Sequence, residues 1–235
     1  LPPEKRSYEP WKPILTVVID CYYRLDLVKK SIQSVLDQDY QNVELVVIDN
    51  GSLPDVTEYL RGIHSTERNV ALIRFRENQF RWEDLNRSVA VCWNAGLLHA
   101  EGDYVTHLSY DDLFSPDYAR RMVSLFTENP NCVTAAPMVV SIGEDGKVNE
   151  SFSLALRANN LRGRYADGLE LALDLLKGNP NSLFSAPGEV FVVRKDALLA
   201  HGGFDRLMDL SQVLKYGTLG DSGFDPDATL FWRHH

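Results

Sequence analysis

The chain has 235 residues, of which 44% are hydrophobic, and it carries a formal net charge of −9. This length and apolar content suffice for one large domain with its own core. The negative charge argues against a protein that tracks a nucleic-acid backbone, because such a protein needs a basic face. An anionic ligand would need positive charge supplied locally, by arginines, a helix N-terminus or a metal ion.

Cysteine usage and apolar runs indicate a protein of the cytoplasm. Cys21, Cys92 and Cys132 lie singly in apolar stretches, a pattern typical of reduced core thiols rather than disulfides or a zinc site. No apolar run reaches the ~18 residues that a membrane helix needs. Residues 1–13 carry charges and prolines where a signal peptide has its apolar core, and no Met begins them. We expect an N-terminal extension on a piece of a longer chain, located in the cytoplasm, or at the inner membrane face if other parts anchor it.

From Ile14 onward, buried strands alternate with amphipathic helices. The β-branched run 14–20 predicts a strand covered on both faces, and the spacing of Val28, Ile32, Val35 and Leu36 predicts a helix. The following elements are a strand at 43–52, a helix at 56–63, a strand at 69–75, a loop at 77–87, a helix at 88–100 and a strand at 103–109.

A helix is expected to start at Ser115 and Pro116, with the serine as cap and the proline in the first turn. Strand–helix alternation with short connections predicts an α/β fold, a Rossmann-like and mostly parallel sheet with helices on both faces. This first half is predicted to span 14–130.

After Asn131 the regular alternation of strand and helix patterns ends. No Pro/Gly/Ser linker separates the halves, so 131–235 is predicted as a smaller annex packed on the first sheet. The helix predicted at 165–178 has Leu169, Ala172, Leu173 and Leu176 facing inward. The other expected elements are strands at 132–142, 147–156 and 189–195, a turn at 143–146, and a short helix that Gly202 and Gly203 end.

Aspartates gather at the ends of the predicted parallel strands. Asp20 and Asp49 end the first two strands, and Asp111 lies just past the fourth. Ligands of such sheets bind beyond the carboxyl ends of the strands. This clustering is the first functional signal in the sequence.

Four stretches resemble the glycosyltransferase family 2 enzymes, which have the GT-A fold. The resemblance runs in family order over most of 14–205 and implies a nucleoside-diphosphate sugar donor and a glycan or other hydroxyl acceptor. The stretches are "LTVVIDCYYR" (15–24), "VELVVIDNGS" (43–52), "WNAGLLHAEGDYVTHLSYDDLFSPD" (93–117) and "VFVVRKDALLAHGGFD" (190–205).

The resemblance implies roles in donor binding at the strand ends. Tyr22, beside Asp20, would stack on a flat base, and Asp49 would accept a hydrogen bond from a pyrimidine ring N–H, which favours a UDP-like donor. Arg87 is offset by one position from a basic residue that relatives place on the donor. The alternatives are an ordinary core aromatic, a turn aspartate bonded to its own backbone, and a solvated arginine.

The family's acidic motif, Asp-x-Asp or Asp-x-Asp-Asp, reads Ser109, Tyr110, Asp111, Asp112 in this chain. The resemblance places Asp111 at the position that binds magnesium or manganese, with Tyr110 beside the donor and Ser109 in place of the first aspartate. One carboxylate, two phosphate oxygens and waters complete an octahedral shell. In the alternative interpretation both aspartates only cap the following helix.

The C-terminal "LFWRHH" (230–235) resembles a late Arg-x-His element that supplies a further metal ligand. Its spacing favours His235, with His234 as the alternative, although paired histidines at a chain end are also typical of a purification tag.

Relatives carry a Glu-Asp pair after Gly-Gly-Phe-Asp, and this chain has Met208-Asp209 there at a shortened spacing. Asp209 is therefore the predicted base of an inverting, single-displacement glycosyltransferase, with a metal ion that stabilises the departing diphosphate. Two other interpretations stay open. One is a GT-A module that binds nucleotide-sugar or glycan without turnover, and the other is a phospho-acceptor or nucleotide-binding sheet.

Overall fold

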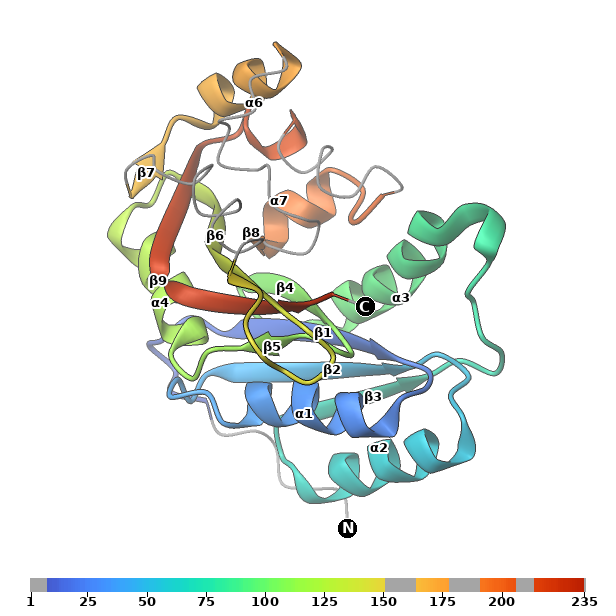
Figure 1. Cartoon of the computed structure of the whole chain (residues 1–235). Coiled ribbons are helices and arrows are strands. Elements are labelled where there is room, and N and C mark those ends of the chain that lie inside the picture. The colour runs from blue at the N-terminus through green and yellow to red at the C-terminus, as the bar shows by residue number, and fades with distance from the viewer. Residues whose placement is uncertain (1–7, 151–163, 178–190, 206–213, 235) are drawn as a thin grey trace.

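One mixed sheet runs through the computed structural model (Figure 1), which describes residues 8–150, 164–177, 191–205 and 214–234. Within these residues the strand order is β3-β2-β1-β4-β8-β6-β9-β5, and β7 pairs with β9. The second half of the chain thus continues the sheet of the first. The boundary predicted between 14–130 and 131–235 stays a prediction.

The first half is the expected parallel sheet. Its strands β1, β2 and β4 are almost wholly buried because helices cover both faces, whereas β3 at the edge is half-buried. Helices α1 and α2 lie on one side, and α3 lies on the other (Figure 1). A Cβ on Gly96 would come within 2.4 Å of Val18, so α3 packs against β1 at a position that needs glycine. The strands are β1 (Leu15–Cys21), β2 (Val43–Asp49), β3 (Val70–Arg74) and β4 (Tyr104–Ser109), and the helices are α1 (Leu25–Leu36), α2 (Pro54–Thr66) and α3 (Leu85–His99), preceded by the short helix η1 (Trp82–Asp84).

The second half adds strands of both directions. β8 is antiparallel to β4 and β6, whereas the long strand β9 runs parallel to β6 and antiparallel to β5 and β7. Its strands are β5 (Leu113–Phe114), β6 (Cys132–Ile142), β7 (Tyr165–Ala166), β8 (Val192–Arg194) and β9 (Asp221–Arg233), and its helices are α4 (Tyr118–Glu128), α6 (Gly168–Leu176) and α7 (Lys195–Ala200).

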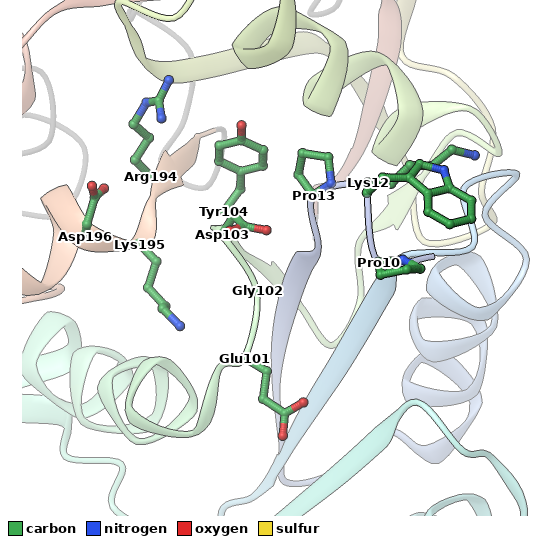
Figure 2. Close-up of a pocket in the computed structure, with 11 residues that line it drawn as sticks. Pro10, Lys12, Pro13, Glu101, Gly102, Asp103, Tyr104, Arg194, Lys195 and Asp196 are labelled. Carbon is green, nitrogen blue, oxygen red and sulfur yellow. The ribbon is translucent and has the colours of Figure 1, made fainter. Parts of the chain in front are cut away.

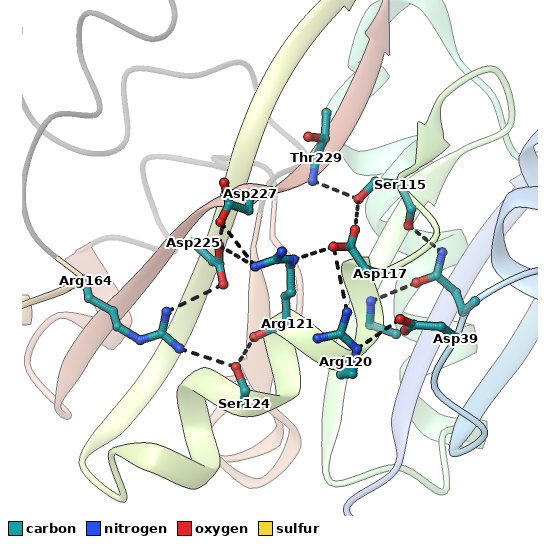
Figure 3. A network of polar contacts seen from close by, with 12 residues as sticks. Asp39, Ser115, Asp117, Arg120, Arg121, Ser124, Arg164, Asp225, Asp227 and Thr229 are labelled. Atoms are coloured by element: carbon teal, nitrogen blue, oxygen red, sulfur yellow. Dashed lines mark hydrogen bonds and ion pairs between the residues drawn. The ribbon is translucent and has the colours of Figure 1, made fainter.

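A network of ion pairs between side chains links β9 to α4 (Figure 3). The β6–β9 pairing shifts register between Pro137 and Met138, and Asp225 of β9 lies at that irregularity. Arg121 of α4 contacts Asp117, lies 3.6 Å from the Asp225 carboxylate and 3.4 Å from that of Asp227. Asp225 is only 3% exposed, and Arg121 together with Arg164, which also lies 3.6 Å from its carboxylate, compensates the buried charge (Figure 3).

Several predicted boundaries were wrong in their details. The fourth helix begins at Tyr118, because Ser115 accepts a hydrogen bond from the Thr229 amide and so belongs to the junction with β9. The predicted strand at 147–156 is represented among the described residues by one bridge, between Val148 and Ile142.

The helix predicted at 165–178 begins later and faces another way. Its first residues form β7, and α6 starts at Gly168, whose backbone lies so close to Gly217 and Gly220 that a side chain would clash. At this position the helix buries Leu171 and Ala172. Of the four residues predicted to face inward, only Ala172 does so, and the other three are exposed: Leu169, Leu173 and Leu176. Leucines at alternate positions place apolar groups on every side of the helix, so the spacing did not define one face.

The cysteines and the membrane prediction can be compared directly with the structure. All three cysteines are free and buried, as predicted, and burial raises the pKa of each thiol. No helix in the described part of the chain has the length and hydropathy to cross a bilayer.

Candidate active site

A cavity of about 640 Å³ opens at the carboxyl ends of β1, β2 and β4. This is the edge at which ligands of parallel sheets bind. The side chains that line it come from the strand ends and from the loop after β3, and they include Asp20, Tyr22, Asn50, Phe80, Trp82 and Tyr110. The structure therefore brings together three of the residues predicted from the sequence, Asp20, Tyr22 and Tyr110.

Tyrosines form one wall of this cavity. Tyr22 is 37% exposed and meets Tyr23 edge-on at 5.8 Å between ring centroids. Tyr23 in turn lies 5.4 Å from the Tyr110 ring. Burial and a hydrogen bond with Tyr23 raise the pKa of Tyr110, so this hydroxyl stays protonated and able to donate. An exposed, supported Tyr22 ring is suited to stacking on a flat ligand.

The loop after β3 contributes a second aromatic wall to the cavity, and neither of its aromatic residues was predicted from the sequence to bind the donor. Phe80 and Trp82 pack edge-on at 5.1 Å, and Trp82 is 79% exposed. The loop is fastened to the end of β2, because the Gln79 amide donates to Asn50 Oδ1 at 2.8 Å. Two aromatic residues in an otherwise polar stretch were the signal available in the sequence.

Asp49 is fully buried and shapes the turn after β2. Its carboxylate accepts hydrogen bonds from the Ser52 amide at 2.8 Å and the Thr57 hydroxyl at 3.0 Å, and Arg74 Nε lies 3.1 Å away. This is the turn aspartate of the alternative interpretation, and it carries Asn50 into the cavity. A contact between Asp49 and a base stays a prediction. Arg87 lies exposed on the first turn of α3, and its role on the donor also stays a prediction.

The indole of Trp93, itself stacked on His107, holds the Asp20 carboxylate in place. Trp93 Nε1 donates to Asp20 Oδ1 at 3.0 Å, and the indole stacks on His107 with 3.4 Å between ring centroids. Burial raises the pKa of Asp20 to about 6, the Trp93 hydrogen bond opposes this, and the charge of Asp111 adds to the increase. Asp20 and Asp111 therefore lie close enough to interact.

The end of β9 holds the acidic motif in place. Asp112 is 2% exposed, and its Oδ1 accepts the Arg233 amide at 2.6 Å. The Arg233 guanidinium donates from Nε to the Asp111 carbonyl at 2.8 Å and from Nη1 to the carbonyls of Gly143 and Glu144. The Asp112 carboxylate is therefore occupied in orienting the loop that carries Asp111.

Asp111 is suited to a divalent cation that also takes ligands from a substrate. Carboxylate oxygens are hard ligands that suit magnesium and manganese. The described part of the chain holds no group of three or more His, Cys, Asp or Glu that could bind a metal ion. An ion at Asp111 would therefore take further ligands from phosphates and water. His235 lies outside the described residues, and His234 donates its amide to the Ile142 carbonyl at 2.8 Å.

Two of the sequence motifs meet through one side chain. Asn94 of α3 accepts from the Phe204 amide at 2.9 Å and donates to the Phe204 carbonyl at 2.8 Å. Gly203 has φ +74, and a Cβ there would come within 2.3 Å of Asn94 Oδ1, so this approach requires glycine. Asp209, the predicted base, follows this junction but lies outside the described residues.

A second cavity, of about 470 Å³, lies at the opposite edge, where β1 and β4 begin (Figure 2). Its charged side chains are committed to the fold. Asp103 accepts the Ile14 amide at 2.9 Å, Lys195 Nζ donates to the Ala100 carbonyl at 3.0 Å, and Arg194 donates to the carbonyls of Cys132 and Pro130. We therefore assign ligand binding to the first cavity.

Known proteins resemble this chain in sequence. The model of glycosyl transferase family 2 matches residues 16–175. An uncharacterised glycosyltransferase of Haemophilus influenzae is 29% identical over 117 residues, which are 50% of this chain and 44% of that protein. The putative teichuronic acid biosynthesis glycosyltransferase TuaG of Bacillus subtilis is 24% identical over 142 residues, 60% of this chain and 53% of its own length. The chain thus spans about half the length of these two relatives.

Solved structures resemble its fold. Mannosyltransferase PcManGT from Pyrobaculum calidifontis, in complex with GDP-Man and Mn²⁺, superposes with a TM-score of 0.65 at 19% identity, over 94% of this chain and 57% of that chain. S. aureus TarS gives a TM-score of 0.67 at 13% identity, over 94% of this chain and 37% of that chain. These likenesses show the fold alone, and that fold is the predicted GT-A architecture. Because the family model covers well over half of its residues, the chain belongs to glycosyl transferase family 2.

Proposed function

We propose that the chain is the catalytic unit of an inverting glycosyltransferase that moves a sugar from a nucleoside diphosphate, with a UDP-like donor preferred, to a hydroxyl acceptor. One observation carries the proposal: the cavity is lined by the exposed ring of Tyr22 and by the carboxylate of Asp20, and Asp111 lies close enough to Asp20 to raise its pKa. A nucleoside diphosphate offers a flat base to the ring, and its diphosphate can meet the carboxylates through a cation.

The acidic end makes a cation necessary. The chain has a net charge of −9, and Asp111, proposed to face the phosphates, lies close enough to Asp20 for the two carboxylates to interact. Two carboxylates repel a diphosphate unless a cation lies between them. Asp111 would hold magnesium or manganese together with the donor phosphates, and His235 is the further ligand proposed from the sequence. When bound, the ion supplies positive charge to the leaving diphosphate.

Each residue has a separate task in the proposed reaction. Tyr22 stacks on the base and fixes the donor, and Asp111 positions its phosphates. Asp209 takes the proton from the acceptor hydroxyl as that oxygen attacks the anomeric carbon from the side opposite the departing diphosphate, which inverts the configuration. TuaG is named for teichuronic acid biosynthesis, and the PcManGT structure contains GDP-Man; both support a nucleotide-sugar donor and a role in glycan or polysaccharide synthesis.

Calorimetric titration tests the proposal. UDP, GDP, CDP and dTDP are each titrated into the protein in Mn²⁺ and in EDTA. We expect one nucleotide to bind at least about tenfold more tightly in Mn²⁺, and Asp111→Asn to remove this difference. Asp55→Asn, which removes an exposed charge on α2, is the matched control and keeps it. Equal affinity in EDTA and Mn²⁺ contradicts the cation bridge, and absence of binding by all four nucleotides contradicts the proposed function.

A non-catalytic module remains the second candidate, because Ser109 stands where relatives have the first aspartate of the acidic motif. Incubation with the sugar nucleotide of the base that binds best separates the two. Release of the nucleoside diphosphate in Mn²⁺, with transfer of the sugar to water or to an added hydroxyl acceptor and abolished in Asp209→Asn, identifies an enzyme. Binding without release in the presence of added hydroxyl acceptors identifies a module.

A further inference from the structure

The acidic motif lacks its first carboxylate, but the neighbouring strand carries one beside the gap. Ser109 ends β4, and in the parallel pairing of β1 with β4 it lies directly opposite Asp20. Successive side chains of a strand alternate between the two faces of the sheet, so residues paired in register across parallel strands share a face. Both residues line the candidate cavity. The sheet therefore places a carboxylate one strand away from the position that lost it.

The fold fixes the direction of this carboxylate. Trp93 Nε1 holds Asp20 Oδ1 at 3.0 Å, and Trp93 itself is 1% exposed. The indole is packed between His107, stacked at 3.4 Å, and Phe204, edge-on at 5.5 Å. No second side chain in the described ranges donates a hydrogen bond to Asp20. One oxygen is thus anchored by the protein, which leaves the other available to a ligand.

Asp20 belongs to the middle one of the three strands that end at the cavity. The strand order is β2, β1, β4, so the base-side residues Asn50 and Tyr22 follow β2 and β1, and Asp111 follows β4. Asp20 is the last residue but one of β1, and it therefore lies between Asn50, which follows β2, and the proposed phosphate ligand Asp111, which follows β4. In a nucleoside diphosphate the ribose occupies this middle position. Its vicinal hydroxyls donate hydrogen bonds, and a carboxylate at a strand end is a known acceptor for them in dinucleotide sites.

We propose that Asp20 binds the ribose hydroxyls of the donor nucleotide and supplies from β1 the carboxylate that Ser109 lacks on β4. This inference rests on the proposed function, because it requires a nucleotide in the cavity. It assigns to Asp20 a preference for ribonucleotides over deoxyribonucleotides, a property separate from the cation at Asp111.

The test compares ribonucleotides with their 2′-deoxy counterparts in Mn²⁺, using UDP with 2′-deoxy-UDP and GDP with 2′-deoxy-GDP. For the pair that binds, we expect the ribonucleotide to bind about 10- to 100-fold more tightly, the worth of a hydrogen bond to a charged group. Asp20→Asn keeps an oxygen for the Trp93 N–H and presents an NH₂ donor to the ribose. In that variant the ratio falls to within about threefold, while Asp55→Asn leaves it unchanged.

The outcomes separate the two proposals. Binding without ribose discrimination in the unaltered protein overturns the Asp20 inference and leaves the proposed function standing, with no variant needed. If Asp20→Asn still binds the ribonucleotide more tightly than its 2′-deoxy counterpart, the Asp20 inference is also overturned. If Asp20→Asn keeps that affinity ratio but loses the dependence of binding on Mn²⁺, Asp20 is a metal ligand and the inference is again overturned. Absence of all nucleotide binding refutes the proposed function itself. The double variant Asp20→Ser with Ser109→Asp, which moves the carboxylate to β4, is expected to restore the ratio.

Discussion

His107 shows how one buried side chain ties stability to pH. It is fully buried on β4, and its two ring nitrogens have no hydrogen-bond partner among the described residues. Burial lowers its pKa to about 3, whereas a histidine in the unfolded chain titrates near 6.5. As the pH falls below about 6.5, His107 binds a proton in the unfolded state but remains neutral in the native state. The contribution of His107 to stability is therefore complete above that pH and is lost progressively toward pH 3.

His107→Phe removes this proton site and keeps a ring against Trp93. We expect its unfolding free energy to fall less between about pH 7 and pH 4.5 than that of the unaltered protein, by on the order of 2 kcal/mol. Asp20, whose pKa is raised, acts in the opposite sense, but it is present in both proteins and cancels in the difference. Urea denaturation followed by tryptophan fluorescence measures the effect. Parallel pH curves for the two proteins would show that His107 is not the source.

At the scale of elements, α3 connects the two halves of the site. Trp93 holds Asp20 of β1, Asn94 holds the Phe204 backbone, and Gly96 packs on Val18. The buried side of α3 therefore also links the candidate cavity to the Phe204 segment, which the predicted base follows in the sequence.

Asn94→Ala should separate these halves. The Phe204 amide and carbonyl lose their partner, and each unsatisfied group costs about 1–3 kcal/mol, so we expect a loss of roughly 2–4 kcal/mol in unfolding free energy. Leu98→Ala, at a position 76% exposed on the same helix, is the control and should change stability by less than about 0.5 kcal/mol. Sugar transfer is expected to fall further than Mn²⁺-dependent nucleotide affinity. An equal fall in both would mean that Asn94 supports the whole fold rather than the junction.

The elements also show what a sequence can predict. The strands β1, β2 and β4 were predicted within a few residues, because uninterrupted β-branched runs have few other uses in a globular protein. Asp20, Tyr22 and Tyr110 reached one cavity because parallel strands end at one edge of a sheet. Asp49 did not expose its carboxylate, since the turn after β2 uses it, and no periodicity marks which way a turn side chain points.

At the scale of the whole molecule, the position of the loop that carries Asp111 and Asp112 depends on β9, a strand far along the chain. Arg233 lies 121 positions from Asp112, yet it binds the Asp111, Gly143 and Glu144 carbonyls and is only 4% exposed. No local pattern near Asp111 predicts such a partner. The sequence placed Arg233 in a motif by resemblance, but its clamp on the loop became visible only from the β5–β9 and β6–β9 pairings.

Arg233→Lys should loosen this clamp, because an ammonium group does not reproduce the fork of the guanidinium. We expect a loss of about 3 kcal/mol in unfolding free energy and weaker Mn²⁺-dependent nucleotide binding, since the Asp111 backbone loses its donor. Arg120→Lys, whose ion pair with Asp39 is half exposed, is the matched control and should cost less than about 1 kcal/mol. Unfolding and nucleotide titration measure both effects. Unchanged binding in Arg233→Lys would mean that the loop is ordered without the clamp.

The parallel pairing of β6 with β9 also matters for a growing nascent chain on the ribosome. β6 pairs with the short strand β8 only at Thr134 and Ala135, and most of its length pairs with β9. Until residues 221–233 have been synthesised, β6 therefore carries a long row of unpaired amide and carbonyl groups, the kind of edge on which strands of other chains can add. The loop that carries Asp111 and Asp112 also gains its contacts with Arg233 only at this late moment. The edge of β6 is thus open to strands of other chains until β9 has been made.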